Sequence, residues 1–272
     1  MTKFFREDTL WQALPDNNGY LVTISCKHVY FTDHQVRGRQ VLPGVVFLEL
    51  ALIGAAKLFP NHTPCKIEEV AWLRPIICEG KEAKIQVLFS LETKLRLVFR
   101  INHGEVTCGF GCICFDNAEG IEHPTVQLTV RDRLIPHKNN QFSHHEIYQA
   151  FTRMGIVYGK YFRRINYVQR NTKTSMSWLS SDDGILMGWS SLMDCAFQSG
   201  MAISLGEHND SLMPYSLGYL ILHKTLPLNA QQHAFVLTEK LSPFRTNITI
   251  FTEKFNPVLS VFELGVKPSN LK

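Results

Sequence analysis

One histidine stands where it could remove a proton from carbon. His34 lies in the segment YFTDHQVRGRQVLPGVVFLELA (30–51), shortly before a long apolar run. That run predicts a helix over 43–59, with Pro43 in its first turn, where a missing N–H costs nothing. The unpaired N–H groups and the positive dipole end would stabilise the negative oxygen of a deprotonated thioester, and Gly44 would let a ligand approach the backbone closely. A neutral imidazole suits this proton transfer because its pKa lies near working pH, although a single histidine is more often structural.

A second chemically useful group lies in another apolar run, SSLMDCAFQSG (190–200). Asp194 is near the start of a helix predicted over 192–206, and Gln198 follows one turn later on the same face. A buried aspartate is costly unless it is hydrogen-bonded or protonated, and Gln198 could be its partner. A carboxylic acid kept neutral by an apolar pocket can protonate a departing hydroxyl. The alternative is that Asp194 only favours the helix N-terminus electrostatically.

The elements that must position these groups occur in two similar halves. Alternating apolar runs predict strands after the first helix, at 65–78, 83–91, 94–101 and 105–115. The second half repeats the pattern around its own helix, with strands predicted at 163–170, 173–179, 216–224, 233–241, 246–254 and 258–266. A helix over 144–154 precedes them, capped by Ser143 with Glu146 at the capping-box position.

We therefore expect an α+β fold in which an antiparallel sheet wraps around a long buried helix, twice over. The halves span 1–118 and 144–272, joined by a linker at 119–143 that is polar and broken by two prolines. An unrelated α+β fold with two buried helices is the alternative.

Composition narrows the class of protein. Apolar residues make up 45% of the 272 residues and charged residues 19%, which supports a large core and argues against disorder. No apolar run is long enough for a membrane span, and the charged N-terminus does not resemble a signal peptide. The net charge of +4 is scattered, so nucleic acid is not an expected partner, whereas an acidic protein would suit it.

The cysteines favour a reduced, cytoplasmic setting. Seven is an odd number, and a chain of this size does not need disulfides for stability. Cys108, Cys112 and Cys114 lie close together, but the alternating sequence around them predicts strand positions, and no second pair follows at zinc spacing.

The histidine segment resembles a known signature. DHQVRGRQVLPG (33–44) is similar to the H-x-x-x-G-x-x-x-x-P motif of dehydratase domains in modular polyketide synthases, with His34, Gly38 and Pro43 in register. The residues around His34 therefore favour a catalytic histidine over a structural one.

Three further segments resemble the same family. LMDCAFQ (192–198) is similar to its D-x-x-x-Q/H motif and supplies Asp194 and Gln198. YGKYF (158–162) resembles the Y-G-P-x-F segment, and LMPYSLGYLILH (212–223) resembles the L-P-x-S segment. The four motifs follow the family's order, so together they are far more specific than any one of them.

The resemblance, which runs from about residue 20 to residue 265, implies a double-hotdog fold with one active site shared between the halves. It implies that His34 is the base and Asp194 the acid in removing water from a 3-hydroxyacyl thioester, giving an α,β-unsaturated product. It also implies a set of residues that orient the acid, line the acyl tunnel or stabilise the oxyanion: Gly38, Pro43, Gly44, Tyr158 and Gln198. The family uses no metal or organic cofactor, and its substrate arrives on the phosphopantetheine arm of an acidic acyl carrier protein.

Partners and context follow from the same resemblance. We expect an acyl carrier protein and neighbouring polyketide synthase domains as partners, and a homodimer by analogy. The absence of ketosynthase and carrier regions favours a piece of a megasynthase over a free-standing protein. A docking face for the carrier could be formed by Arg37, Arg39, Lys160, Arg163 and Arg164, although a solvated surface is the simpler interpretation.

Two departures from the family pattern affect geometry more than chemistry. Lys160 stands where the family has proline, and Trp189-Ser190-Ser191 replaces its His-Pro lead into the aspartate motif. Proline fixes φ and lysine does not, so the first change could alter the loop bordering the site. Asp33, beside His34, is expected to shape the turn.

Other functions stay open on the sequence. Relatives of these domains shift a double bond or close oxygen rings, and isomerase-type relatives usually lack the aspartate that Asp194 supplies here. Ring-forming relatives tend to lose the proline found at Pro43. A non-catalytic scaffold domain is a further alternative, and a hotdog thioesterase is possible on fold grounds alone.

Overall fold

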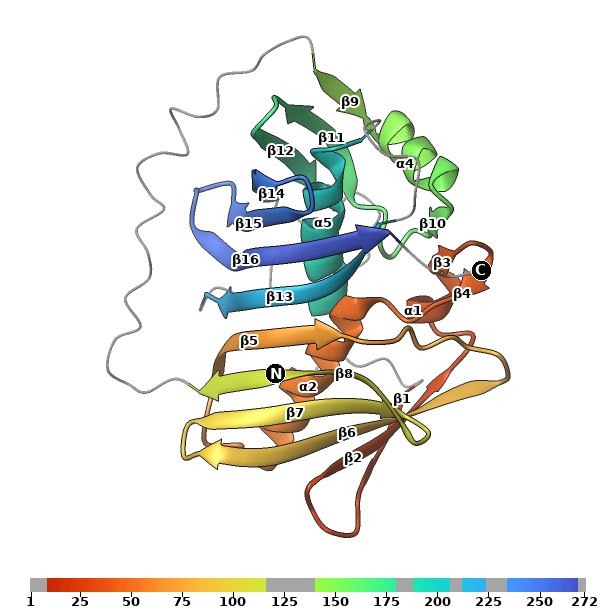
Figure 1. Ribbon diagram of the computed structural model, residues 1–272, viewed down its shortest axis with the longest axis vertical. Coiled ribbons are helices and arrows are strands. Elements are labelled where there is room, and N and C mark those ends of the chain that lie inside the picture. The colour runs from red at the N-terminus through yellow and green to blue at the C-terminus, as the bar shows by residue number, and fades with distance from the viewer. Residues whose placement is uncertain (1–8, 116–139, 180–187, 206–211, 224–233, 269–272) are drawn as a thin grey trace.

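The chain folds as two helix-and-sheet units that share one continuous sheet (Figure 1). The structure is a computed structural model, and it describes residues 9–115, 140–179, 188–205, 212–223 and 234–268. None of the helices within these ranges is long and apolar enough to cross a membrane.

The N-terminal half is built around helix α2 (Gly44–Leu58). This helix is apolar nearly all round, so it has no face to offer water, and ten of its residues are buried. Alternating residues of the sheet, such as Ile85 and Val87, are fully buried in the same core. The strands of this half are β1 (Thr9–Ala13), β2 (Gly19–Ser25), β5 (Pro64–Trp72), β6 (Glu82–Thr93), β7 (Arg96–His103) and β8 (Val106–Phe115).

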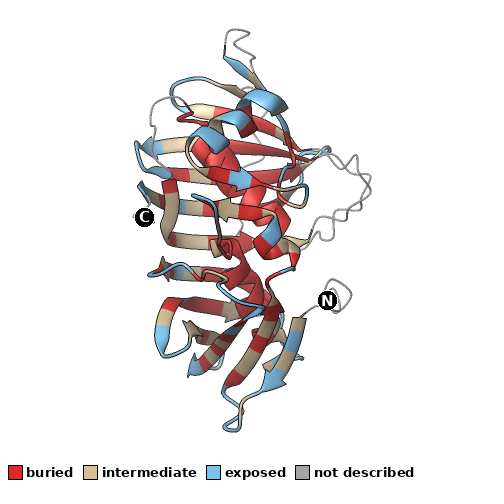
Figure 2. Ribbon diagram, turned by 90° about the vertical axis from the view of Figure 1, so that its right-hand side faces the viewer, coloured by how far each residue is buried: buried red, intermediate tan, exposed pale blue. Residues whose placement is uncertain are grey.

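The C-terminal half repeats this arrangement around helix α5 (Trp189–Ala202), which is buried along almost its whole length (Figure 2). Its strands are β9 (Gln141–Ser143), β11 (Ile165–Arg170), β12 (Thr174–Leu179), β13 (Leu212–Leu222), β14 (Ala234–Ser242), β15 (Arg245–Thr252) and β16 (Pro257–Pro268). Helix α4 (His144–Arg153) packs against β9, β11 and the short strand β10 (Ile156–Tyr158), and Ser143 and Glu146 form the predicted capping box.

The two halves meet edge to edge. β5 pairs with β13 in antiparallel register, so that Ile67 faces Leu220, and the strands of the two halves named above form one 13-stranded sheet. The two central helices also contact each other. This junction joins the halves through backbone hydrogen bonds as well as through the core.

A small second sheet crosses between the halves. It consists of β3 (His34–Val36), β4 (Arg39–Gln40) and β10 (Ile156–Tyr158), in the order β10-β3-β4, and the helix α1 (Val29–Thr32) leads into it. Strands this short carry no periodic signal, which is why the sequence did not predict them.

The helices and strands that the sequence predicted are present, with differences at their ends, whereas β1 and β2 were not predicted. Helix α5 begins three residues earlier than predicted, because Ser190 and Ser191 are helical, with hydroxyls bonded to Tyr161. Gln141–Ser143 form β9 and pair with β11, so these residues belong to the C-terminal half rather than to a linker. The rest of the predicted linker lies outside the described residues.

The cysteine prediction was wrong for one pair. Cys26 and Cys78 form a disulfide, whereas the sequence indicated only reduced cysteines. The two residues are far apart in sequence, and it is the fold that brings them together. Cys108, Cys112 and Cys114 all lie on β8, as the alternating sequence predicted.

Candidate active site

His34 opens β3 and is held in a single orientation by the backbone. Its Nδ1 atom lies 2.8 Å from the carbonyl oxygen of Val41. A carbonyl can only accept, so Nδ1 carries the hydrogen, and in the neutral ring Nε2 has the free lone pair. Burial lowers the pKa of His34 to about 4. The imidazole is therefore neutral at pH 7 and can act as a base through Nε2.

Asp194 lies in the second turn of α5, in an apolar environment. Burial raises the pKa of its carboxyl to about 7, and the hydrogen bond from Gln198 lowers it slightly from what burial alone would give. A substantial fraction of this carboxyl is protonated at neutral pH, so it can donate a proton.

Gln198 fixes which oxygen of Asp194 donates. Its Nε2 donates to the Phe162 carbonyl (2.9 Å) and to Asp194 Oδ2 (2.6 Å), and its Oε1 accepts from the Tyr148 hydroxyl (2.9 Å). The Phe162 carbonyl can only accept, so this network admits one orientation of the amide. Because Oδ2 is occupied as an acceptor, the acidic proton belongs on Oδ1.

The base and the acid converge on the same loop, residues 158–162. The ring of His34 lies edge-on to Tyr158 and Phe162, with ring centres 5.5 Å and 6.0 Å apart. On the other side, Gln198 bonds the Phe162 carbonyl, and the pKa of Tyr158 is raised by burial first and by the charge of Asp194 second. His34 comes from the N-terminal half and the Asp194–Gln198 pair from the C-terminal half, so both halves contribute side chains to the surroundings of this loop.

The residues around the start of α2 have more specific roles than the sequence indicated. Pro43 is the N-cap of α2, and its carbonyl accepts from the Val46 N–H (3.0 Å). The space that a side chain at Gly44 would take is filled by the indole of Trp72, which donates to the Gly44 carbonyl (2.9 Å). The group that approaches Gly44 closely in the structure is therefore Trp72, and the approach of a ligand to this glycine stays a prediction.

Gly38 has a conformational role. Arg37 and Gly38 both have positive φ (51° and 76°), as required in the two-residue turn that joins β3 to β4. No atom outside its chain neighbours lies within 4 Å of the place where a Gly38 side chain would begin. This glycine therefore shapes the hairpin that carries His34, and its place beside the substrate stays a prediction.

Asp33 anchors the 158–162 loop, which the sequence did not predict. Its Oδ2 accepts from the Tyr161 N–H (2.8 Å), and its carbonyl accepts from the Gly159 N–H (2.8 Å). Lys160, where the related domains have proline, is exposed, and the loop is held by Asp33 instead. The signal in the sequence was an aspartate beside the candidate base, which was interpreted only as a turn residue.

Glu49 and Tyr148 were also missed. Tyr148 fixes the Gln198 amide, as described above, and Glu49 is a buried carboxyl that accepts from the Tyr30 hydroxyl (2.8 Å). An acidic residue inside the apolar run VVFLELALIGAA was a usable signal, because a carboxyl is rarely buried without partners.

A groove of about 520 Å³ borders the site. Tyr148 and Tyr158 form its inner wall, and His145, Arg153 and Arg163 contribute basic groups without any carboxylate. His34 and Asp194 do not line it. Of the basic residues considered for docking, Arg163 lies here, whereas Arg39 pairs with Glu79 (2.7 Å) and Arg164 is buried.

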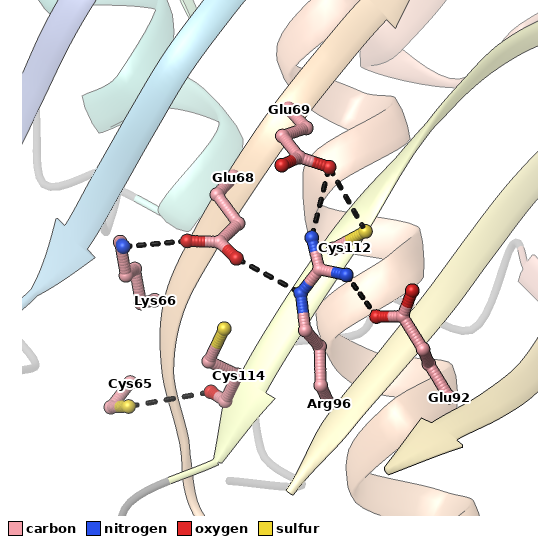
Figure 3. A network of polar contacts seen from close by, with 8 residues as sticks. All are labelled: Cys65, Lys66, Glu68, Glu69, Glu92, Arg96, Cys112 and Cys114. Carbon is pink, nitrogen blue, oxygen red and sulfur yellow. Dashed lines mark hydrogen bonds and ion pairs between the residues drawn. The ribbon is translucent and has the colours of Figure 1, made fainter.

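A separate charged cluster lies on the face of the sheet turned away from α2 (Figure 3). Arg96 is surrounded by Glu68, Glu69 and Glu92, and Lys66 pairs with Glu68 (2.5 Å). These groups are partly exposed and pair with one another, so the cluster is a surface ion-pair network with a small effect on stability.

Comparison with known proteins gives a consistent result. The family model of the polyketide synthase dehydratase domain matches residues 12–103. Polyketide synthase ThaG of Burkholderia thailandensis is 29% identical over 219 residues, which cover 75% of this chain and 4% of ThaG. The chain thus corresponds to a small part of its curated relatives.

Solved structures share the whole fold. The dehydratase domain from the CurF module of curacin polyketide synthase has a TM-score of 0.80 at 16% identity, covering 97% of this chain and 98% of that one. Two CurK dehydratase mutants described as inactive are also similar, each at 16% identity and with 97% of this chain covered. The mutant in which phenylalanine replaces a histidine has a TM-score of 0.77, with 97% of its own chain covered. The mutant in which asparagine replaces an aspartate has a TM-score of 0.76, with 98% of its own chain covered. The expected double-hotdog fold is confirmed.

Proposed function

We propose that this chain, which belongs to the polyketide synthase dehydratase family, removes water from a 3-hydroxyacyl thioester to give an α,β-unsaturated thioester. The observation that carries the proposal is that a neutral buried imidazole and a buried carboxyl whose pKa is raised to about 7 both lie beside the 158–162 loop. Elimination of water needs a base and an acid at the same pH, and these two environments supply both.

The reaction then runs through two proton transfers. Nε2 of His34 takes a proton from C2 of the acyl chain, and the electron pair released forms the C2–C3 double bond as the C3–O bond breaks. Asp194 gives the proton on Oδ1 to the departing hydroxyl, which leaves as water. The N–H groups at the start of α2 stabilise the negative charge on the thioester oxygen. A proton then returns from the imidazolium to the carboxylate, and both groups are ready again.

Both transfers are assigned to side chains of this chain, so the proposed reaction calls for no metal or organic cofactor. The related CurK dehydratase, described as inactive when a histidine or an aspartate is replaced, supports the two roles. A buried acid with a raised pKa also favours dehydration over double-bond migration, which needs only a base.

The test uses a panel of 3-hydroxyacyl thioesters of both configurations on an acyl carrier protein, followed by mass spectrometry for loss of water. We expect turnover by the wild type, and losses of about 10²–10⁴-fold in His34→Ala and Asp194→Asn. Glu92→Gln, in the surface network, is the matched carboxyl control and should retain full activity.

Exchange of the C2 proton in D2O separates the two roles. Asp194→Asn should still exchange this proton, because the base remains, whereas His34→Ala should not. NMR of the product alkene distinguishes dehydration from double-bond migration. Water loss at the wild-type rate in His34→Ala would refute the assignment.

We also propose the partners of this reaction. An acyl carrier protein would bring the substrate, neighbouring polyketide synthase domains would supply and consume it, and a homodimer is the expected assembly. The basic groove beside Tyr158, with Arg153 at its rim, suits an acidic carrier. Arg153→Glu should raise KM for a carrier-bound substrate but not for the same acyl group on a small thiol. Arg100→Glu, on the exposed side of β7, is the control, and an equal KM for both substrate forms in Arg153→Glu would exclude the groove.

We place the protein in the cytoplasm, where polyketide intermediates are assembled on carrier proteins. The Cys26–Cys78 disulfide is uncommon in that compartment. Alkylation of free thiols in cells, followed by mass spectrometry of these two cysteines, shows whether they are reduced, as the cytoplasm favours, or joined in the disulfide.

A further inference from the structure

Glu49 is a buried carboxyl that the proposed reaction does not use. It lies in the second turn of α2, where the residues before and after it are apolar, and only 5% of its surface is exposed. On its own half it has one partner, the Tyr30 hydroxyl, whose oxygen lies 2.8 Å from Glu49 Oε2. Burial of a carboxyl with a single hydrogen bond is costly, so further partners are expected.

Those partners belong to the other half of the molecule. Burial raises the pKa of Glu49, and the hydroxyl and the backbone N–H of Ser190 act on the carboxyl in the opposite direction, as donors lying beside it do. Ser190 is in the first turn of α5, where N–H groups have no partner within the helix. The N-cap of α5 is Gly188, which has no side chain to cap the helix.

The geometry leaves no room for a conventional cap. A Cβ on Gly188 would lie 2.5 Å from the Tyr161 hydroxyl oxygen and 3.9 Å from Glu49 Oε1. The space next to the first turn of α5 is thus occupied by groups that arrive from elsewhere in the fold. The carboxyl of Glu49 takes the place that a capping side chain of α5 would fill, and it also lies at the positive end of the helix dipole.

A second set of contacts reinforces the same turn. The Tyr161 hydroxyl lies 3.2 Å from Ser190 Oγ, and the Ser191 hydroxyl donates to the Tyr161 carbonyl (2.6 Å). Tyr161 is in turn held by Asp33, next to His34. The first turn of α5 is therefore tied to the N-terminal half through two carboxyls, one on α2 and one beside the base.

We propose that Glu49 caps α5 from the opposite half and thereby fixes the position of Asp194 relative to His34. Asp194 follows Ser190 by one helical turn on the same face, so a shift of the first turn displaces the acid directly. Glu49 is a positioning residue: it acts through Ser190 and α5, and it touches neither the substrate nor His34. This inference rests on the proposed dehydration, for which Asp194 is the acid.

The magnitude follows from how strongly proton transfer depends on distance. A displacement of about 1 Å in a catalytic group can cost about 10²-fold in rate. Binding of the acyl chain depends much less on the exact position of Asp194 than the rate of proton transfer does. Loss of the cap should therefore lower kcat and leave KM nearly unchanged.

The activity test compares two substitutions at one position. Glu49→Leu removes the acceptor and should lower kcat by about 10–100-fold, with KM within about twofold of the wild type. Glu49→Gln retains an acceptor oxygen for the Ser190 N–H and an amide that can donate to a neighbouring hydroxyl, so it should restore kcat to within about threefold. Glu92→Gln again serves as the control for loss of a carboxyl. A merely structural role would reduce the folded fraction, which circular dichroism reports, without the split between kcat and KM.

Hydrogen exchange tests the cap without reference to activity. In Glu49→Leu, the backbone amides of residues 190–194 should exchange at least tenfold faster than in the wild type, while those in the middle of α2 keep their protection. Should Glu49→Leu fail to fold, Ser190→Ala provides the second variant. It removes one of the two donors to Glu49 and should show a smaller, several-fold loss of kcat and faster exchange in the same turn.

The outcomes are distinct. A folded Glu49→Leu variant with wild-type kcat and wild-type amide exchange in the first turn of α5 overturns the inference. A Ser190→Ala variant in which kcat and amide exchange are both those of the wild type overturns it as well. A wild-type protein that dehydrates none of the thioesters overturns the proposed function instead, and the exchange measurement then still decides whether Glu49 caps α5.

Discussion

The Nδ1 atom of His34 lies 2.8 Å from the carbonyl oxygen of Val41, at the point where the chain turns towards helix α2. The same short segment therefore orients the base and leads into the helix whose N-terminus would stabilise the thioester oxygen. Val41 is held in turn by a bridge to Ile77, and Leu42 donates to the Ile76 carbonyl (2.8 Å). The orientation of the imidazole thus depends on backbone contacts, which side-chain substitutions elsewhere leave in place.

The opposite pKa shifts of His34 and Asp194 predict the pH dependence of the proposed dehydration, in which His34 is the base and Asp194 the acid. The base must be neutral, which holds above its pKa of about 4, and the acid must be protonated, which holds below its pKa of about 7. We expect kcat/KM to be constant between these values and to fall about tenfold per pH unit on either side. Initial rates at fixed ionic strength measure this profile, and the alkaline decline should be absent from the residual activity of Asp194→Asn. A rate that keeps rising through pH 8 contradicts the assignment of Asp194 as the acid.

The same shift makes Asp194 a pH-dependent cost to stability. Its pKa is higher in the folded state than the 3.8 of an unperturbed carboxyl, so the folded state binds this proton more tightly. The stability from that proton is fully present below pH 3.8 and is lost as the pH rises through about 7. Asparagine does not titrate, so Asp194→Asn should be more stabilising at pH 8 than at pH 5, by roughly 2–3 kcal/mol.

Urea unfolding at the two pH values measures this difference. Asp16→Asn, in an exposed turn, is the control and should change the unfolding free energy equally at both. An Asp194→Asn effect that is independent of pH would show that the carboxyl ionises as readily in the folded protein as in the unfolded chain.

Much of the fold could be predicted from residue patterns. The apolar runs that contain Leu48 and Ala196 predicted two buried helices, because a helix without a polar face must be enclosed. The alternating runs around them predicted most of the strands. The pairing of β5 with β13 could not be predicted, because register between distant strands depends on tertiary contacts rather than on local sequence.

The site was predictable only in part. His34, Asp194 and Gln198 could be predicted as candidates because their spacing matches a recognisable signature, and the hydrogen bond between the last two follows from the helical period. Asp33 and Glu49 could be recognised only as unusual acidic residues, since their contacts are with the other half of the chain. The Cys26–Cys78 bond was missed for the same reason, because cysteine counts do not reveal which residues meet.

Gly159 should be sensitive to the smallest substitution. A Cβ on this residue would overlap the side chain of Asp33, lying 2.7 Å from its Cβ and closer still to its carboxyl. Gly159→Ala must therefore displace either Asp33 or the 158–162 loop, on which both His34 and Gln198 pack. We expect kcat to fall by about 10²-fold in a protein that remains folded. Gly80→Ala is the matched control, because nothing outside its neighbours lies within 4 Å of the added carbon, and equal activity of the two variants would show that the loop tolerates the shift.

The Cys26–Cys78 disulfide should contribute measurably to stability. It closes a loop between residues 52 apart, which in the chain-entropy model corresponds to about 4 kcal/mol of unfolding free energy. Dithiothreitol should therefore lower the urea midpoint of the wild type. The substitution Cys78→Ser should lower the midpoint even without dithiothreitol, and adding dithiothreitol to this variant should change nothing further. Cys114→Ser, a free cysteine at a half-buried position, is the control and should respond to dithiothreitol as the wild type does.

Because Cys78 also donates its N–H to the Gln40 carbonyl (3.0 Å), the segment beside Val41 stays attached when the disulfide is reduced. Reduction should therefore change kcat by less than about threefold. A wild-type midpoint that does not move with reductant would mean that the two thiols only lie side by side.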